Sequence, residues 1–307
     1  MPSILVIGSS NTDMVVKTEK FPQPGETILG GQFFMFPGGK GANQAVAAAR
    51  LGGDVTFVCK IGDDIFGKNA VAGFVQEGIH VEGVFTAASL PSGVALITVN
   101  GQGQNEIVVA SGANAALSEA DIQKAAAALE TADLVLLQLE IPLATVEYAV
   151  HLAKSKGKKV IVNPAPAQPL PKSIYQDLFL ITPNETETEI LTDIVVKDEA
   201  SALRAATLLK SWGVANVIVT MGEKGAFVLA DGFTGMIPTP QVKAVDTTAA
   251  GDVFNGALAV ALASGENWQE ACQFACKAAA ISVTRMGAQA SAPTRKEMDE
   301  WSAGLQG

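Results

Sequence analysis

Short apolar segments rich in valine, isoleucine and leucine alternate with helix-like segments along most of this chain, and this alternation constrains its fold more than any other feature. The segments "SILVIGS" (3–9), "VTFVCKIG" (55–62), "DLVLLQL" (133–139) and "KKVIVNPAP" (158–166) are typical of buried strands. Helix-like stretches lie between and after them, at 41–53, 65–77, 118–129, 143–156 and 198–212. The pattern predicts βαβ units and a three-layer α/β fold, a mostly parallel sheet flanked by helices.

Residues 13–36 and 93–110 differ from this pattern, because polar and apolar residues mix there as in exposed strands. The turn "GQGQ" (101–104) joins two such strands into an evident hairpin. These two regions predict a small β-sheet that stands apart from the main one. No repeat, low-complexity tract or linker interrupts the chain, so we expect a single domain over 1–307.

The C-terminal half adds further expected elements. A strand is predicted at "LFLITPNE" (178–185), and "NVIVTMGEKGAFVLAD" (216–231) is either a plain hairpin or a surface that supports a nucleotide. Three helices are expected near 251–264, 267–284 and 295–303.

Composition excludes several classes of partner. Hydrophobic residues make up 48% of the chain and charged residues 17%, so a large core is available. The net charge of −10 argues against nucleic acid or an anionic membrane as the main partner. No apolar run approaches the roughly 18 residues of a membrane span, and the N-terminus lacks the pattern of a signal peptide. We therefore expect a soluble cytoplasmic protein.

The segment "VDTTAAGDVFNG" (245–256) precedes an apolar helix built from small residues. Ala249, Ala250 and Gly251 leave their amides unobstructed, so this helix N-terminus can accept an anion, with Asp246 or a threonine capping the turn. A carboxylate at Asp252 would repel a passively bound anion, but it would suit a base that deprotonates a hydroxyl attacking a phosphate. On spacing alone, an equally good interpretation is that both aspartates are only helix caps.

Three more clusters combine glycine-rich turns with short polar side chains. "PGGKGANQAVAAA" (37–49) carries Lys40 and Asn43, and with Asn11 and Asp13 it fits a polyhydroxylated ligand, although turns and caps would explain each piece alone. In "ITPNETE" (181–187), Glu187 is either a capping-box partner or a group that faces a phosphate-bound magnesium ion through water. The fourth cluster is "VIVTMGEKGAFV" (217–228), within the segment described above. The dinucleotide fingerprint G-x-G-x-x-G is absent, which disfavours a nicotinamide dehydrogenase.

Taken together and in this order, "PGGKGANQA", "NPAPAQPLP", "ITPNETE" and "DTTAAGDVFNGAL" resemble the ribokinase-like (phosphofructokinase B) family of carbohydrate kinases over nearly the whole chain. The resemblance implies ATP-dependent phosphorylation of D-ribose at its 5-hydroxyl, with Asp252 as the catalytic base. It implies an anion hole made by the amides of Ala249, Ala250, Gly251 and Asp252. The sequence of the motif "GGKGAN" is more similar to that of family members that act on ribose than to that of members that act on fructose or adenosine.

The resemblance also implies two binding sites. The residues expected to hold the sugar are Asn11, Asp13, Gly39, Lys40, Gly41, Ala42, Asn43, Glu140 and Asp252. Those expected to hold ATP are Asn184, Thr220, Met221, Gly222, Glu223, Lys224, Gly225, Gly251, Asp252 and Cys276. Cys276 replaces a histidine or asparagine common in relatives, and a small core residue is at least as good an interpretation of it.

Two cations and a partner chain follow from the same resemblance. Magnesium would arrive with ATP and face Glu187 through water. A monovalent cation, potassium, would lie among Asp246, Thr248, Ser282, Arg285, Gly287 and Ser291, in part through backbone carbonyls. Thr248 stands where relatives often carry a bulky aliphatic residue. The small sheet would act as a lid over the sugar and join two copies into a homodimer.

Alternatives remain within and outside this class. The chain could be a kinase for 2-deoxyribose, fructose or a nucleoside on the same fold, or a non-catalytic sugar-binding regulator. An unneutralised base at Asp252 argues against the regulator, because a binding protein gains nothing from it.

Overall fold

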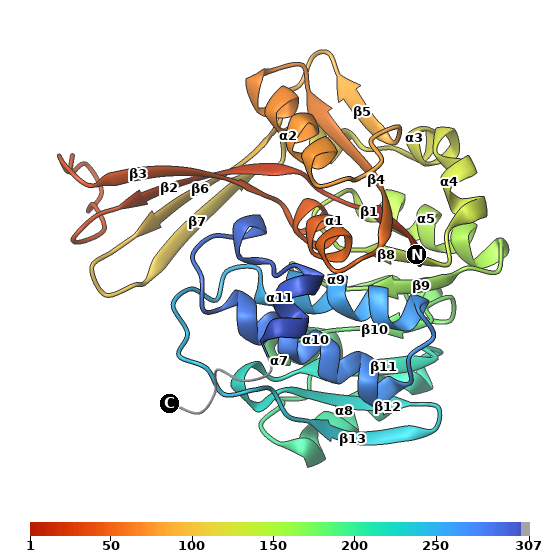
Figure 1. The fold of residues 1–307 in the computed structure, drawn as a ribbon. Coiled ribbons are helices and arrows are strands. Elements are labelled where there is room, and N and C mark those ends of the chain that lie inside the picture. Colours follow the sequence, from red (N-terminus) through yellow and green to blue (C-terminus); the bar gives the residue numbers. More distant parts are fainter. Residues whose placement is uncertain (302–307) are drawn as a thin grey trace.

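A nine-stranded sheet forms the centre of the molecule, which a computed structural model describes for residues 1–301 (Figure 1). Its strands lie in the order β13-β12-β11-β10-β9-β8-β1-β4-β5, and those from β11 to β5 are parallel. The parallel strands are β1 (Ser3–Ile7), β4 (Asp54–Gly62), β5 (Val84–Ala87), β8 (Leu134–Leu137), β9 (Lys159–Val162), β10 (Leu180–Ile181) and β11 (Asn216–Thr220). The predicted mostly parallel sheet is confirmed.

Helices cover both faces of this sheet, because apolar side chains point alternately to either side along each buried strand. Ile4 and Val6 of β1 pack on one face, whereas Leu5 and Ile7 pack on the other. The first face is covered by α1 (Lys40–Arg50), α2 (Ile65–Gln76), α9 (Ala250–Ala263) and α10 (Trp268–Ser282). The second is covered by α3 (Glu119–Lys124), α4 (Ala126–Thr131), α5 (Leu143–Ser155), α6 (Lys172–Tyr175) and α8 (Glu199–Ser211). The three-layer prediction is therefore confirmed.

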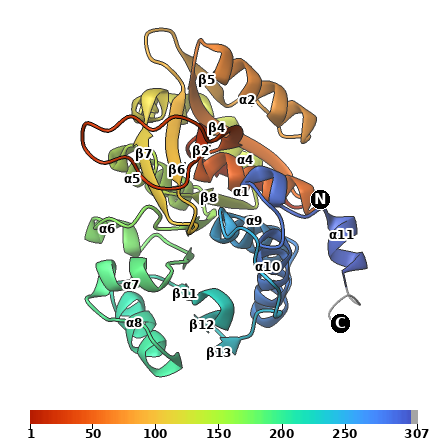
Figure 2. The same ribbon diagram turned by 90° about the vertical axis from the view of Figure 1, so that its left-hand side faces the viewer.

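A separate four-stranded sheet projects from one side of the main body (Figures 1 and 2). Its strands lie in the order β3-β2-β6-β7, formed by β3 (Gln32–Gly38), β2 (Asn11–Lys17), β6 (Gly93–Val99) and β7 (Asn105–Ala110). The β6–β7 hairpin has the predicted turn, and the separate sheet is confirmed. We call this element the small sheet.

Several element boundaries were predicted wrongly. The expected helix 118–129 is two helices, since the chain bends at Ala125 between α3 and α4. The expected strand 178–185 pairs only over β10, because Asn184 already caps α7 (Glu185–Thr192). The hairpin β11–β12 (Ala226–Ala230) is confirmed, but a third antiparallel strand, β13 (Phe233–Ile237), was missed. The helix expected at 295–303 is α11 (Arg295–Glu300), and residues 302–303 lie outside the described part.

Close backbone approaches bring α1 and α9 to the carboxyl ends of the parallel strands. Gly39 links β3 to α1 with φ of +89°, and a Cβ there would lie 2.7 Å from the backbone nitrogen of Asn11. A Cβ on Gly256 of α9 would lie 2.7 Å from the carbonyl oxygen of Gln44 on α1. The two helices therefore pack without an intervening side chain, which sets the first turn of α1 against the first turn of α9. Between residues 1 and 301, no helix has both the length and the apolar character that a membrane crossing demands.

Candidate active site

The N-terminus of α9 presents free backbone donors. Ala249, its N-cap residue, has a left-handed conformation with φ of +60°, and no side chain caps the helix. Asp246 caps the turn before the helix, as predicted, by accepting from the amide of Thr248 at 2.9 Å; its other oxygen accepts from the amide of Gly287, also at 2.9 Å. No acceptor among residues 1–301 pairs with the amides of Gly251 and Asp252. An anion can approach these amides directly.

Asp252, in the first turn of α9, is buried, with 5% of its surface exposed. Its Oδ2 accepts a hydrogen bond from Nδ2 of Asn43, and its Oδ1 accepts one from Nε2 of Gln44, both at 2.9 Å. Burial raises the pKa of Asp252, and Glu140 adds to this, whereas Lys40 and the two amide donors act in the opposite direction. The net shift is upward, as is typical of a carboxylate that exchanges a proton.

The charges of four carboxylates act on the ammonium group of Lys40, at the first position of α1. Burial alone would lower the pKa of Lys40, but the charges of Asp252, Glu140, Glu187 and Asp13 raise it above its usual value. Burial also raises the pKa of Asp13 to about 6, helped by Glu140 and Asp252 and opposed by Lys40. The cluster therefore carries a surplus of negative charge.

This cluster contains four of the residues expected to hold the sugar, Asp13, Lys40, Glu140 and Asp252. Ala42, also expected there, has no exposed surface, and its amide donates to the carbonyl of Ser9. Oε2 of Glu140 accepts from the amide of Lys40 at 3.0 Å and from the hydroxyl of Ser9 at 2.5 Å. Oδ1 of Asn43 is buried and has no hydrogen-bond partner among the described residues. A buried acceptor without a partner costs free energy unless a ligand hydroxyl donates to it. This atom favours a hydroxylated ligand next to Asp252.

Asn11 is held by a residue that the sequence analysis missed. Nδ2 of the buried Asn114 donates to Oδ1 of Asn11 at 2.7 Å, and Oδ1 of Asn114 accepts from the amide of Ser10 at 2.9 Å. Oδ1 of Asn11 is thereby occupied, so its Nδ2 is the group that remains to donate to a ligand.

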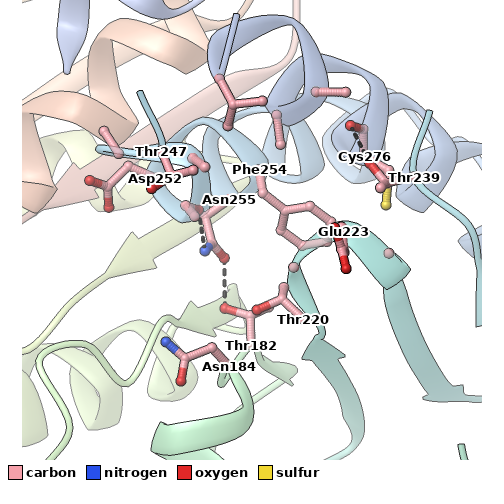
Figure 3. A pocket seen from close by; sticks show the side chains of 18 of the residues that line it. Thr182, Asn184, Thr220, Glu223, Thr239, Thr247, Asp252, Phe254, Asn255 and Cys276 are labelled. Atoms are coloured by element: carbon pink, nitrogen blue, oxygen red, sulfur yellow. Dashed lines mark hydrogen bonds between the residues drawn. The ribbon is translucent and has the colours of Figure 1, made fainter. Parts of the chain in front are cut away.

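A cavity of about 680 Å³ extends from Asp252 toward Cys276 (Figure 3). One end is polar and includes Lys40, Asp252 and the amides of α9. The other end, near Thr239 and Cys276, is lined by smaller and more apolar residues, among them Pro240, Val242, Ala279, Ala280 and Val283. Phe254, Asn255, Thr182 and Thr247 also line the cavity, although the sequence analysis missed them.

Most of the residues expected around ATP line this cavity, namely Asn184, Thr220, Gly222, Glu223, Gly225, Gly251, Asp252 and Cys276. Two do not. Met221 is buried, with 2% of its surface exposed, and Nζ of Lys224 donates to the carbonyl of Lys197 at 2.9 Å. Asn184 and Glu187 form a reciprocal capping box at 2.8 Å, so the capping interpretation is confirmed, while both residues also line the cavity.

The six residues expected to hold potassium lie outside the cavity wall, on the loop before α9 and on the segment from the last residue of α10, Ser282, to Ser291. Asp246 joins these two segments through Thr248 and Gly287, and the guanidinium group of Arg285 pairs with Glu297 at 2.7 Å. The hydroxyls of Ser282 and Ser291 donate to nearby carbonyls. No group of three or more His, Cys, Asp or Glu residues within 1–301 could hold a metal, so a cation here would depend on hydroxyl and carbonyl oxygens together with the single carboxylate of Asp246.

Comparison with known proteins identifies relatives of this chain. The model of the pfkB family of carbohydrate kinases matches residues 1–295. The chain is 46% identical to a ribokinase of Haemophilus influenzae, over 97% of this chain and 98% of that protein. It is 41% identical to a deoxyribokinase of Salmonella typhi, over 97% and 98%.

Solved structures agree in fold. A ribokinase from Thermotoga maritima is 44% identical and superposes with a TM-score of 0.90, over 98% of this chain and 99% of that one. A ribokinase from Arabidopsis thaliana complexed with ribose and ATP is 32% identical, with a TM-score of 0.89 over 97% of both chains.

Proposed function

Because the chain belongs to the pfkB family of carbohydrate kinases, we propose that it transfers the γ-phosphoryl group of ATP to the 5-hydroxyl of D-ribose, with Asp252 as the general base. The observation that carries this proposal is the first turn of α9. There, a buried carboxylate lies beside two unpaired amides, at the polar end of a cavity large enough for a nucleotide. The carboxylate takes the proton of the attacking hydroxyl, and the amides stabilise the charge that develops on the phosphoryl oxygens.

The two ends of the cavity suit the two ends of ATP. Its phosphates would lie against the amides of Gly251 and Asp252, and its adenine would lie in the less polar part near Cys276. The Arabidopsis relative was solved with ribose and ATP, and we propose that a sugar in this chain lies in the neighbouring cluster of Asn11, Asp13, Asn43 and Glu140.

A kinase for 2-deoxyribose is the second candidate, because a deoxyribokinase is about as similar to this chain as several ribokinases are. The two sugars differ by one hydroxyl, so the carboxylate of Asp13 and the amide of Asn11 matter most for the choice. ADP release with ribose, 2-deoxyribose, fructose and adenosine would test the proposal. The highest kcat/KM is expected for ribose. A higher kcat/KM for 2-deoxyribose or adenosine would overturn the choice of sugar, and binding of ribose without ADP release would overturn the kinase.

Sugar affinity is expected to fall below about pH 6. When Asp13 is ionised, both of its oxygens can accept hydrogen bonds from sugar hydroxyls, and protonation turns one of them from an acceptor into a donor. The pKa of Asp13 is raised to about 6 by burial and by Glu140 and Asp252. Protonation at lower pH removes this acceptor, so KM for ribose is expected to rise roughly tenfold from pH 7 to pH 5. KM measured across this range checks the expectation. The variant Asp13→Asn should bind ribose weakly at both pH 7 and pH 5. If KM for ribose in that variant still rose between these pH values as in the natural chain, another group would be responsible for the effect.

Magnesium fits the chemistry of the polar end. Free ATP would meet the surplus carboxylates around Lys40, and a divalent cation on the phosphates removes this repulsion. The cavity wall carries Glu185, Glu187 and Glu223, and Glu187 would hold the ion through water. Such an ion supplies charge neutralisation on the transferred group.

Potassium is proposed for the two segments that Asp246 joins. Carboxylate, hydroxyl and carbonyl oxygens of Asp246, Thr248, Ser282, Arg285, Gly287 and Ser291 are the donors that a hard cation prefers. Such an ion would supply positive charge next to the turn that begins α9.

Exchange of potassium for a large organic cation such as tetramethylammonium is expected to lower kcat. The turn at Ala249 has a left-handed conformation without a glycine, so it depends on its surroundings to keep the α9 amides in place. Initial rates at constant ionic strength in the two salts check this, with sodium as a control cation smaller than potassium. Equal rates in potassium and tetramethylammonium would count against the cation site.

The small sheet is also proposed to join two copies of the chain. It exposes a set of large apolar side chains, namely Phe33, Met35, Leu96, Ile107, Val108 and Val109. Exposed apolar surface of this kind is typical of a protein interface. Light scattering of the intact chain, with Val108→Glu as the variant, tests the homodimer.

A further inference from the structure

A buried network of side-chain amides contacts Asp252 and reaches the cavity wall only at Asn163. Its central member is Gln44, the fifth residue of α1. Gln44 has no exposed surface. Nε2 of Gln44 donates to Oδ1 of Asp252 at 2.9 Å and to Oδ1 of Asn163 at 3.0 Å. Oε1 of Gln44 accepts from Nε2 of Gln138 at 2.5 Å. Both hydrogens of the Gln44 amide and its oxygen are therefore used.

The direction of these hydrogen bonds is fixed by a backbone carbonyl, which can only accept. Nδ2 of Asn163 donates to the carbonyl of Thr182 at 3.2 Å, so Oδ1 of Asn163 must be the acceptor that faces Gln44. The amide of Gln44 must then turn its nitrogen toward Asn163, and the same nitrogen meets Asp252. A reversed Gln44 would put its oxygen against two acceptors, Oδ1 of Asn163 and Oδ1 of Asp252.

We propose that Gln44 is a positioning residue for the general base: its amide, oriented by Asn163 and Gln138, holds the Asp252 carboxylate in one orientation as a deprotonated acceptor. Asn43 supplies the matching donor to Oδ2, so both carboxylate oxygens face amide hydrogens from adjacent residues of α1. A protonated carboxyl would place its own hydrogen against one of these donors. This inference rests on the proposed function, because only a base must remain ionised while it is buried.

Other charges also face Asp252 and must be considered in a pH experiment. Lys40 on α1 favours the ionised form of Asp252, whereas Glu140 after β8, Asp13 on β2 and Glu187 on α7 disfavour it. A variant at Gln44 leaves all four in place, so a change in the pH profile would report on the amide alone.

The test is the pH dependence of kcat in the variant Gln44→Met, which keeps the length of the side chain but removes its donors. Loss of a hydrogen bond to a charged acceptor is expected to move the acidic limb of the profile upward by about one pH unit. Above that limb, kcat is expected to fall about tenfold, because the carboxylate is less well oriented. KM for ATP should change little, since Gln44 does not line the cavity.

Two further variants keep the proposal falsifiable. Gln44→Glu preserves the shape but places a second carboxylate against Asp252, so its acidic limb should move at least as far. Asn216→Leu is the matched control, because Asn216 is an equally buried amide at the start of β11, bonded to Phe179 and Asp231 and remote from the cavity. It should lower the melting temperature without moving the limb.

The outcomes separate this inference from the proposed function. The role of Gln44 would be overturned if folded Gln44→Met or Gln44→Glu protein kept the acidic limb of the natural chain's pH profile and a kcat within about twofold of the natural value. If Asn216→Leu also shifted the acidic limb of the pH profile, the shift would be explained by a general loss of stability. That result would also overturn the proposed role of Gln44. Near-normal turnover in Asp252→Asn would instead overturn the proposed base itself.

Discussion

The variant Asp252→Asn is expected to lower kcat by at least about 100-fold, because a positioned base contributes roughly 10²- to 10⁴-fold to such a reaction. Asn cannot accept the proton of the sugar hydroxyl, while the amides of α9 and the cavity remain. KM for ribose should therefore change much less than kcat. Steady-state rates of ADP release, with ribose binding measured by calorimetry, check both expectations.

Stability must be followed in the same variant. Both oxygens of Asp252 accept hydrogen bonds, from Asn43 and Gln44, so the new NH₂ group of Asn must face one of these donors. A lower melting temperature is expected and does not by itself explain lost turnover. Near-normal kcat in folded Asp252→Asn protein would remove Asp252 from the mechanism.

The variant Gly251→Val should lower kcat by at least about 100-fold for a different reason. The new side chain would block the approach of the phosphate to the amide donors of α9. A Cβ on Gly251 would meet no atom within 4 Å, because it would point into the cavity. The chain should accept the new side chain, but a phosphate could no longer approach the first turn of α9. ADP release and a thermal melt would measure the two properties side by side.

Gly73 on α2 offers a matched control, since a Cβ there also meets nothing within 4 Å and the position is also helical. Gly73→Val should leave kcat unchanged, because Gly73 is remote from the cavity. Loss of activity in both variants would point to a general effect of valine in a helix, and full activity of Gly251→Val would argue against an anion at this turn.

The parts of the site that could be predicted from the sequence are those with a local signal. Asp252 follows small residues at the start of an apolar helix, and Asn184 with Glu187 has the spacing of a capping box; the structure puts both at the cavity. The alternation of apolar strands and helices was enough to predict the three layers. In each case the residues that interact are close in sequence or share one periodic pattern.

The residues that were missed have partners far away in the chain. Gln44, Gln138 and Asn163 come from three separate elements, and each looks like an ordinary polar residue in its own segment. Asn114 holds Asn11 from more than 100 positions away. The left-handed conformation of Ala249 was equally hidden, because alanine rarely adopts it and only the surrounding loops make it possible.

The charge around Lys40 has a consequence for which nucleotide the protein accepts. Four acidic groups outnumber the one ammonium group whose charge they influence, so a bare triphosphate would meet a surplus of like charge near Asp252. Under the proposed function, a triphosphate that already carries its divalent cation avoids this barrier. The protein then needs no dedicated residue to distinguish the triphosphate with its cation from the triphosphate without it. The net negative charge of the cluster around Lys40 is enough to favour the first.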